Sequence, residues 1–310
     1  MSIFVATLAV WGALLLGAYV IAVLDRLVVP GRHLVGPAVE APLATVANLL
    51  GEQRLIPRGP DGLLFRSAPL IALVVVGLGA LIIPIGPGLV AFDPSAGIFY
   101  FVAVSSPFMV AMMNAGWSQN SKVGLFGTFR AAAYLISTEV PFGFAAIGPV
   151  MAAESLSTVR IVESQASLWH AVWQPLGLAI YLMTALMMTF RHPFDSALAG
   201  SELEGGVLAE YTGAWLLLFK VALNAFFVVL MALAVVLFFG GWQGPLLPGP
   251  VWFAMKTVAL AALVLWGSRF APRLRHDQML TFAWKILLPA ALVNIMLVGI
   301  LALLLPGGGA

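Results

Sequence analysis

Three ionisable side chains fall inside long apolar stretches of the sequence. Glu139 lies in Ser137-Thr138-Glu139-Val140-Pro141, and Lys220 and Lys256 fall in two later stretches. Charge within a bilayer is costly unless it is paired or hydrated, so such groups mark proton or ion pathways by default. Pro141 frees backbone groups beside Glu139 and makes room for water. We predict a proton-path role for Glu139 and Lys220, whereas Lys256, near the start of its stretch, should extend its ammonium to the membrane surface.

A second group of candidates is the acidic loop that precedes the stretch containing Lys220. It carries four carboxylates: Asp195, Glu202, Glu204 and Glu210. A run of charge is usually a solvated loop. Here apolar residues are interleaved with the acids, namely Pro193, Phe194, Leu198, Leu203 and Leu208. The mixture favours a loop packed against another surface, where partly dry carboxylates are candidates for proton exchange.

Several classes of chemistry are excluded or unsupported. Cysteine is absent, which rules out disulfides, cysteine nucleophiles and thiolate-bound clusters. The histidines, His33, His170, His192 and His276, lie in different loops without metal-ligand spacing. A net charge of +2 gives no footprint for nucleic acid, and no glycine pattern follows a strand as dinucleotide binding requires. We predict no catalytic residue and no metal site in this chain, so any redox centre must be carried by a partner.

The elements that position these residues are membrane-spanning helices. The composition is 62% hydrophobic and only 9% charged, with a mean hydropathy of +1.04, and soluble domains carry roughly 25% charged residues. Nearly uncharged stretches long enough to span a bilayer occur eight times, at about 3–24, 68–90, 97–115, 127–152, 168–190, 212–240, 250–268 and 282–305. Nothing alternates as a β-barrel strand would. We predict an all-α membrane protein that forms one polytopic domain over residues 1–310, with its first span in place of a cleaved leader.

The basic residues predict the orientation of these spans. Most of the 15 lysines and arginines fall in the odd-numbered loops. Under the positive-inside rule these loops are cytoplasmic and both termini lie on the opposite side, here of a bacterial inner (plasma) membrane. In the long first loop, Val39, Leu43, Val46, Leu49 and Leu50 recur at helical spacing. That pattern predicts an amphipathic helix, either at the membrane interface or packed on the cytoplasmic end of the bundle.

Several motifs resemble the H-type membrane subunit of respiratory complex I, the bacterial counterpart of mitochondrial NADH dehydrogenase subunit 1. The most specific is Gly116-Trp117-Ser118-Gln119-Asn120-Ser121-Lys122, which continues through Arg130-Ala131-Ala132-Ala133 to Ile136-Ser137-Thr138-Glu139-Val140. Others resemble further family motifs in the same order along the chain: Asp25-Arg26 with Val35-Gly36-Pro37, Arg191-His192-Pro193-Phe194-Asp195, Ser201-Glu202-Leu203, Glu210-Tyr211-Thr212-Gly213, and Asp277-Gln278 with Trp284-Lys285-Ile286-Leu287-Leu288-Pro289.

The resemblance implies a subunit of a proton-translocating NADH:quinone oxidoreductase that performs no catalysis alone. Such a subunit forms the membrane side of the quinone chamber, with quinone as substrate and with iron–sulfur clusters and flavin held only by partner subunits. The implied partners are peripheral-arm iron–sulfur and quinone-site subunits, small and antiporter-like membrane subunits, and the lipid bilayer. By position, the chamber and its loops would contain Arg26, Lys122, Arg130, Arg191, Asp195, Glu202, Glu210 and Tyr211. Glu139 would belong to the proton path, together with Glu204 and Lys220.

The sequence also departs from this family. Positions where the family has carboxylates hold Met188, Leu198, Gly200 and Leu223, so the proton path is thinned or rerouted, and Glu204 is a candidate replacement. Lys220 and the pattern over 202–211 are similar to the membrane subunit of energy-converting [NiFe] hydrogenases. An anchor and ion-coupling subunit of such a complex is therefore the alternative hypothesis. A stand-alone transporter or channel is a third, and the loop motifs argue against it.

Overall fold

The computed structural model describes residues 3–28, 35–53, 57, 59–198, 203–245 and 247–304, and within them it is built from helices without a named strand. The elements follow one another along the chain with these bounds: α1 (Ile3–Leu27), α2 (Val35–Gly51), α3 (Gly62–Ala80), α4 (Gly97–Ser118), α5 (Lys122–Ala153), α6 (Thr158–Glu163), α7 (His170–Trp173), α8 (Pro175–Met188), the 3-10 turn η1 (Gly206–Leu208), α10 (Gly213–Phe238), α11 (Gly249–Ser268), α12 (His276–Phe282), the π-helical turn η2 (Ala283–Leu287) and α13 (Leu288–Leu304).

Seven helices in the described part of the chain are long and apolar enough to cross a membrane, which confirms an all-α membrane protein. The fifth predicted span, 168–190, is not one long helix. Pro175 begins a new helix after the non-helical Gln174, and the resulting α8 has 14 residues. At 1.5 Å per residue it is about 21 Å long, shorter than the roughly 30 Å hydrocarbon core. α7 and the turn before it form the first part of the predicted stretch 168–190.

The second predicted span is displaced along the sequence. The apolar run 68–90 suggests a helix to its end, but α3 starts at Gly62 and stops at Ala80. Pro84 and Pro87 cannot donate helical hydrogen bonds, and the chain turns through an isolated bridge between Gly86 and Leu89. Arg66 therefore lies inside α3, although the sequence places it in the first loop.

The helix predicted in the first loop is present as α2. It packs against α1 and α10, with Leu49 buried. Val39, Leu43, Val46 and Leu50 remain exposed, and Leu50 reaches 63%. A row of exposed apolar side chains on a helix that also touches the bundle is consistent with both placements predicted for it.

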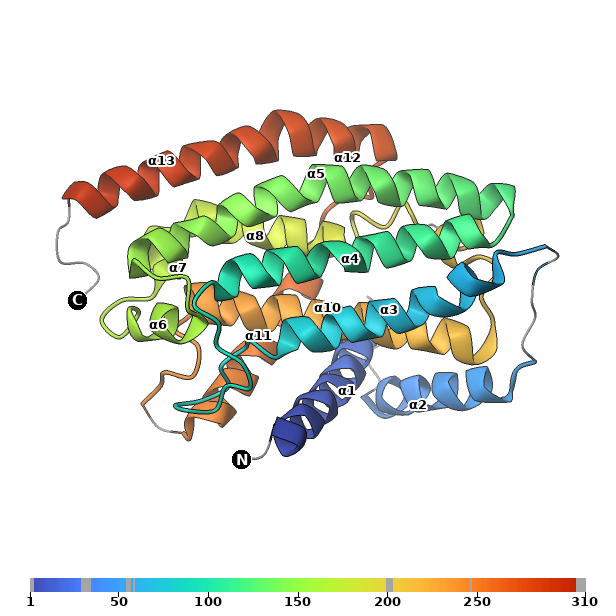
Figure 1. Ribbon diagram of the computed structural model, residues 1–310, viewed down its shortest axis with the longest axis horizontal. Coiled ribbons are helices and arrows are strands. Elements are labelled where there is room, and N and C mark those ends of the chain that lie inside the picture. Colours follow the sequence, from blue (N-terminus) through green and yellow to red (C-terminus); the bar gives the residue numbers. More distant parts are fainter. Residues whose placement is uncertain are drawn as a thin grey trace.

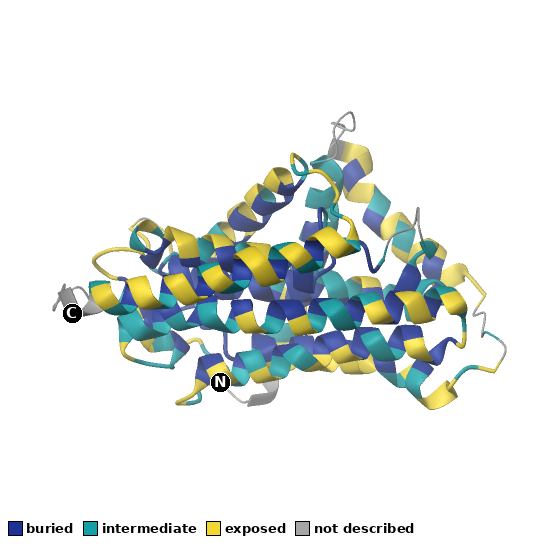
Figure 2. Ribbon diagram, turned by 90° about the horizontal axis from the view of Figure 1, so that it is seen from above, coloured by how far each residue is buried: buried dark blue, intermediate teal, exposed yellow. Residues whose placement is uncertain are grey.

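α10 is the central helix of the bundle. It contacts α1, α2, α3, α8 and α11, and 78% of its most apolar window is buried, against 17% for α1 and 22% for the final span. In Figure 1, α1 is inclined to the other long helices and α2 lies beside it, while α13 follows the opposite edge. Exposed positions line the outer faces of the helices in Figure 2, and many of them are apolar, as in a protein surrounded by lipid or partner subunits.

Loop residues 190–198 and 203–211 and the ends of the long helices meet at one end of the bundle, which we call the basic end. It contains the last turn of α1, the first turns of α5 and α10, and the chain following α8 and α11, and its basic residues include Arg26, Lys122, Arg191 and Arg269. Close backbone contacts fix this end: a Cβ on Gly127 would lie 2.5 Å from the backbone nitrogen of Val207. Only glycine lets α5 approach the loop so closely.

Candidate functional site

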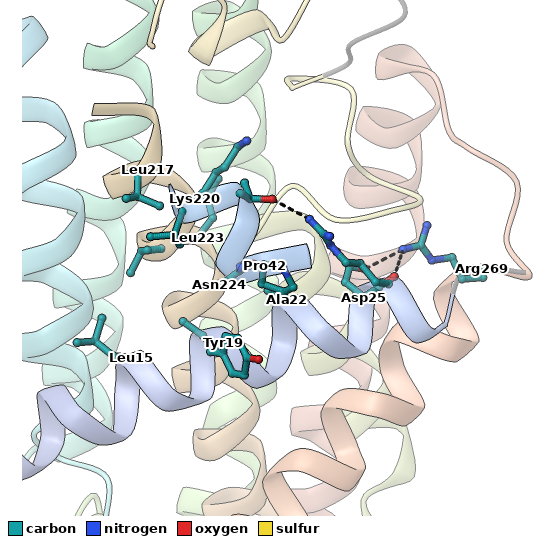
Figure 3. Close-up of a pocket in the computed structure, with 15 residues that line it drawn as sticks. Leu15, Tyr19, Ala22, Asp25, Pro42, Leu217, Lys220, Leu223, Asn224 and Arg269 are labelled. Atoms are coloured by element: carbon teal, nitrogen blue, oxygen red, sulfur yellow. Dashed lines mark hydrogen bonds and ion pairs between the residues drawn. The ribbon is translucent and has the colours of Figure 1, made fainter. Parts of the chain in front are cut away.

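A groove of about 650 Å³ runs between α1, α2 and α10 at the basic end. Its walls are mostly apolar and include Leu15, Leu217 and Val221. Figure 3 shows Leu15, Tyr19, Ala22 and Asp25 in order along α1, with Arg269 at the far end beside Asp25. The groove therefore leads from an apolar region of the helices to charged side chains.

An inner cavity of about 280 Å³ adjoins the groove. Residues 189–192, Asp195 and Leu198 form one wall, and α10 and the end of α11 form the other. Four lining residues are shared with the groove: Asp25, Leu223, Asn224 and Arg269. The shared residues make the inner cavity the continuation of the groove.

A cluster of charged and polar side chains occupies this junction. Asp25 Oδ2 accepts from Arg191 Nη1 at 3.3 Å, and Asp25 Oδ1 accepts from Arg269 Nη2 at 2.7 Å. Arg191 also donates from Nη2 to Asn224 Oδ1 at 2.7 Å, and its guanidinium carbon lies 4.3 Å from the ring centre of Phe227. Burial lowers the pKa of Arg191, and the Asp25 carboxylate opposes that shift. Two cations on one carboxylate leave positive charge at the point where groove and cavity meet.

Besides Arg269, the groove wall has two basic residues, which differ in their partners. Arg26 donates from Nη2 to Thr45 Oγ1 on α2 at 3.0 Å, which ties the end of α1 to the amphipathic helix. Lys220, on α10, is exposed. Its side chain lines this groove, and its predicted role in the proton path stays a prediction.

The acidic loop is packed against the bundle, as its apolar residues predict. Arg130 donates to the backbone oxygen of Ser196 at 2.8 Å, and the Tyr134 hydroxyl lies 3.1 Å from Ser196 Oγ. Asp195 forms an ion pair with Arg273 at 2.7 Å. Together these contacts hold the inner-cavity wall in place from α5 and from the chain after α11.

The later part of the loop is held by α3 and α4. Buried Gln119 donates to the backbone oxygen of Val207 and accepts from the backbone nitrogen of Glu210 at 3.3 Å. Tyr211 donates to Phe65 O at 2.9 Å and stacks on the Phe65 ring, with ring centres 4.1 Å apart. Burial raises the pKa of Tyr211 to about 12, so it is a neutral hydrogen-bond donor at physiological pH. Glu210 and Tyr211 thus position the loop.

The remaining loop candidates lie away from the two cavities. Glu204 is exposed, with a φ of 47°, and Lys122 is exposed at the start of α5. Neither lines the groove or the inner cavity. Glu202 lies outside the described residues.

Glu139 forms a separate buried polar site in the middle of α5. Both carboxyl oxygens are buried, and neither has a hydrogen-bond partner among the described residues; the same is true of Ser137 Oγ. Ser106 faces Glu139 from α4, although its hydroxyl donates to Val102 O. The Ser137 carbonyl also lacks its helical donor, because the residue four positions later is Pro141. The middle of α5 therefore holds a carboxylic acid and other polar groups whose hydrogen bonds are not made within the described residues.

The three predicted proton-path residues are thus not gathered in one place. Glu139 lies within the span, Lys220 in the groove and Glu204 on an exposed turn. Where the family resemblance expects further acids, Met188 is fully buried, Leu198 lines the inner cavity and Leu223 lines both cavities. Gly200 lies outside the described residues. Among described residues the inner cavity keeps two acids, Asp25 and Asp195.

Sequence reasoning did not select Asp25, Asn224, Arg269 or Gln119 as site residues. Asp25 pairs with partners 166 and 244 residues away, and such a pairing has no local signal. Asn224 carried a detectable signal, since it is a lone amide in the apolar stretch of α10. No group of three potential metal-ligating side chains occurs within the described residues.

Lys256 is half-buried, and its side chain reaches the backbone that follows α10. Its ammonium donates to the carbonyl oxygens of Phe239, Gly241 and Gln243 at 2.7, 3.2 and 2.7 Å. It also lies 4.7 Å from the ring centre of Trp169. These carbonyls follow the end of α10, so Lys256 caps that helix from α11.

Replacing Lys256 by Met is expected to destabilise the subunit by about 2 kcal/mol, the typical loss for hydrogen bonds to a charged group. The substitution keeps the apolar stem but leaves the carbonyls without a donor. The measurement is the temperature at which this subunit dissociates from its purified assembly. Lys285→Met, at an exposed lysine, is the matched control; equal melting of the two variants would contradict the capping role.

Comparison with known proteins agrees with this architecture. The family model described as NADH dehydrogenase matches residues 4–299. Two similar proteins are H-type subunits of NADH-quinone oxidoreductase from Rhodopseudomonas palustris, the one numbered 2 in strain CGA009 and the one numbered 1 in strain HaA2. Each is 38% identical over 258 residues, which cover 83% of this chain and 81% of the relative. The chain belongs to the NADH dehydrogenase family, as a membrane subunit of the complex I type.

Proposed function

We propose that this chain forms the membrane side of the quinone chamber in a complex I-type NADH:quinone oxidoreductase and couples quinone reduction to proton translocation. The observation that carries the proposal is the junction of groove and inner cavity at Asp25, Leu223, Asn224 and Arg269. An apolar groove that ends among hydrogen-bond donors suits a molecule with a long apolar tail and a polar carbonyl head. The relatives' names include this substrate class.

In this proposal the groove walls accept the quinone tail from the bilayer, and the inner cavity receives the head. Arg191 and Arg269 are the cations nearest to that end of the path. They stabilise negative charge that develops on the head during reduction, because preformed donors in a partly dry site interact more strongly than water does. Electrons come from an iron–sulfur cluster of a partner, and flavin also belongs to partner subunits.

The basic end is then the cytoplasmic end, by the distribution of lysine and arginine, and both termini lie across the membrane. It would be covered by the peripheral-arm iron–sulfur and quinone-site subunits. The outer faces of the spans would meet small and antiporter-like membrane subunits and lipid.

Coupling requires an element that changes state when charge appears in the chamber. The loop segments 190–198 and 203–211 are the candidate. The first lines the inner cavity with Asp195 and is bound to α5 through Ser196, and the second is bound to α3 and to the end of α4 through Tyr211 and Glu210. Glu139, on the same α5 that binds Ser196 through Arg130, is the candidate proton carrier. The hydrogenase-type alternative lacks similar support, because the relatives named above are quinone-linked subunits.

Filling the groove tests the access route. Ala22→Phe places a ring in the groove wall and is expected to raise the KM for quinone about tenfold, since overpacking costs about 1–3 kcal/mol. Steady-state NADH:quinone turnover of the complete complex measures this. Ala9→Phe makes the same change at an exposed position of α1 that does not line the groove. An unchanged KM in Ala22→Phe, with the complex assembled, would exclude this entrance.

A further inference from the structure

Lys220 is a charged side chain without a partner in an otherwise apolar wall. It is exposed, and the described residues give it no hydrogen bond or ion pair. Figure 3 shows its nitrogen without a dashed line, in contrast to the linked Asp25 and Arg269. A lone ammonium in such a wall is costly unless an anion or water meets it. The quinone path described above does not need this cation.

The groove lining has an excess of positive charge. Three basic residues, Arg26, Lys220 and Arg269, face one acid, Asp25. That acid is already bound by two guanidinium groups, those of Arg269 and Arg191. Neither Arg26 nor Lys220 therefore has a carboxylate partner among the described residues of the groove, and the groove has a net attraction for an anion.

The apolar part of the groove reaches the outer surface of the bundle. Leu15 and Val46 line it and are 55% and 36% exposed, and α1 is the least buried span. Lys220 lies seven residues into α10, which is about 10 Å from the helix start. A lysine at that depth reaches the headgroup level by extending its side chain. The groove can thus hold one molecule that enters from the membrane and carries both an anionic group and an acyl chain.

We propose that this groove binds an anionic phospholipid, with its phosphate-bearing headgroup at Lys220 and Arg26 and an acyl chain against α1 and α10. The net charge of the lining favours a lipid with a net negative headgroup over a zwitterionic one. The site is a property of the groove itself and does not depend on the proposed quinone access.

Photolabelling of the complete complex tests the site. The complex is placed in phosphatidylcholine nanodiscs that contain a trace of phosphatidylglycerol carrying a photoactivatable acyl chain. Phosphatidylcholine with the same chain is the matched probe. Labelled peptides from α1, α2 and α10 are counted by mass spectrometry. The anionic probe should label them at least fivefold more than the zwitterionic probe, because each basic residue near the surface contributes about 1 kcal/mol, which is about fivefold.

Variants assign the preference to the lysine. Lys220→Leu, at an exposed position of an apolar helix, should lower the ratio about fivefold, because it removes one basic residue, and Lys220→Arg should preserve the ratio. Equal labelling by both probes in the unmodified complex overturns the proposal without any variant. A ratio that is undiminished in Lys220→Leu overturns the assignment.

A short-chain quinone added before photolysis separates this site from the access route. If the quinone lowers labelling, lipid and quinone share the groove and the lipid site is confirmed there. If the lysine-dependent preference persists undiminished at saturating quinone, the lipid site stands and the proposed quinone entrance fails.

Discussion

Replacing Arg191 by Met is expected to lower quinone turnover about 30-fold, because hydrogen bonds to a charged group contribute about 2 kcal/mol. The guanidinium donates to Asp25 and Asn224 and lies over Phe227, at the junction of groove and cavity. Methionine fills similar volume but leaves the Asn224 oxygen without this donor and removes one of two cations beside Asp25. The quinone head would meet a site with less positive charge.

The measurement is kcat for quinone in the purified complex, with NADH oxidation by an artificial acceptor as a check on the partner subunits. Arg160→Met, at an exposed arginine remote from the basic end, should keep full turnover. Arg191→Lys retains the charge but cannot reach two acceptors with a planar fork, so an intermediate rate is expected. Full turnover in Arg191→Met with normal assembly would remove this residue from the chamber.

The sequence predicts the helices best where apolar runs end at charged or turn residues. The runs at 3–24 and 97–115 correspond to α1 (Ile3–Leu27) and α4 (Gly97–Ser118). It fails where a proline coincides with the end or the start of a helix, because hydropathy does not distinguish such a proline from one inside a helix, such as Pro107 of α4. The run 68–90 is broken near Pro84 and Pro87, and the run 168–190 is broken at Pro175.

The candidate site also contains residues that the sequence proposes and residues that only the packing of the helices reveals. Arg26, Arg191 and Asp195, which the family-like motifs propose as chamber residues, line the groove or the inner cavity, and their role in a quinone chamber stays a prediction. Asp25 and Asn224 become partners of Arg191 only when α1, α8 and α10 pack together. Lys220 lies in an apolar run, and its direction around α10 places its side chain in the groove; its role in a proton path stays a prediction. Direction depends on which helices neighbour α10, and a single sequence does not specify those neighbours.

Glu139→Gln is expected to abolish most proton translocation while the complex still assembles. Glutamine has the same shape, and both Glu139 oxygens lack partners among the described residues, so no intrasubunit hydrogen bond is lost. The neutral amide cannot bind and release a proton. General acid–base and proton-carrier side chains typically contribute about 10²–10⁴-fold, so we expect at least a tenfold loss of proton-linked turnover.

Proton uptake by vesicles containing the complex measures this, alongside quinone reduction with an uncoupler present. Glu154→Gln is the matched control, since Glu154 is exposed at the end of the same helix. Normal proton translocation in Glu139→Gln would show that the buried acid carries no protons. Lost assembly would show instead that a neighbouring subunit binds the carboxylate directly. Loss of translocation with assembly retained assigns the proton to Glu139, because the free groups at Ser137 and Pro141 cannot take up and release a proton at neutral pH.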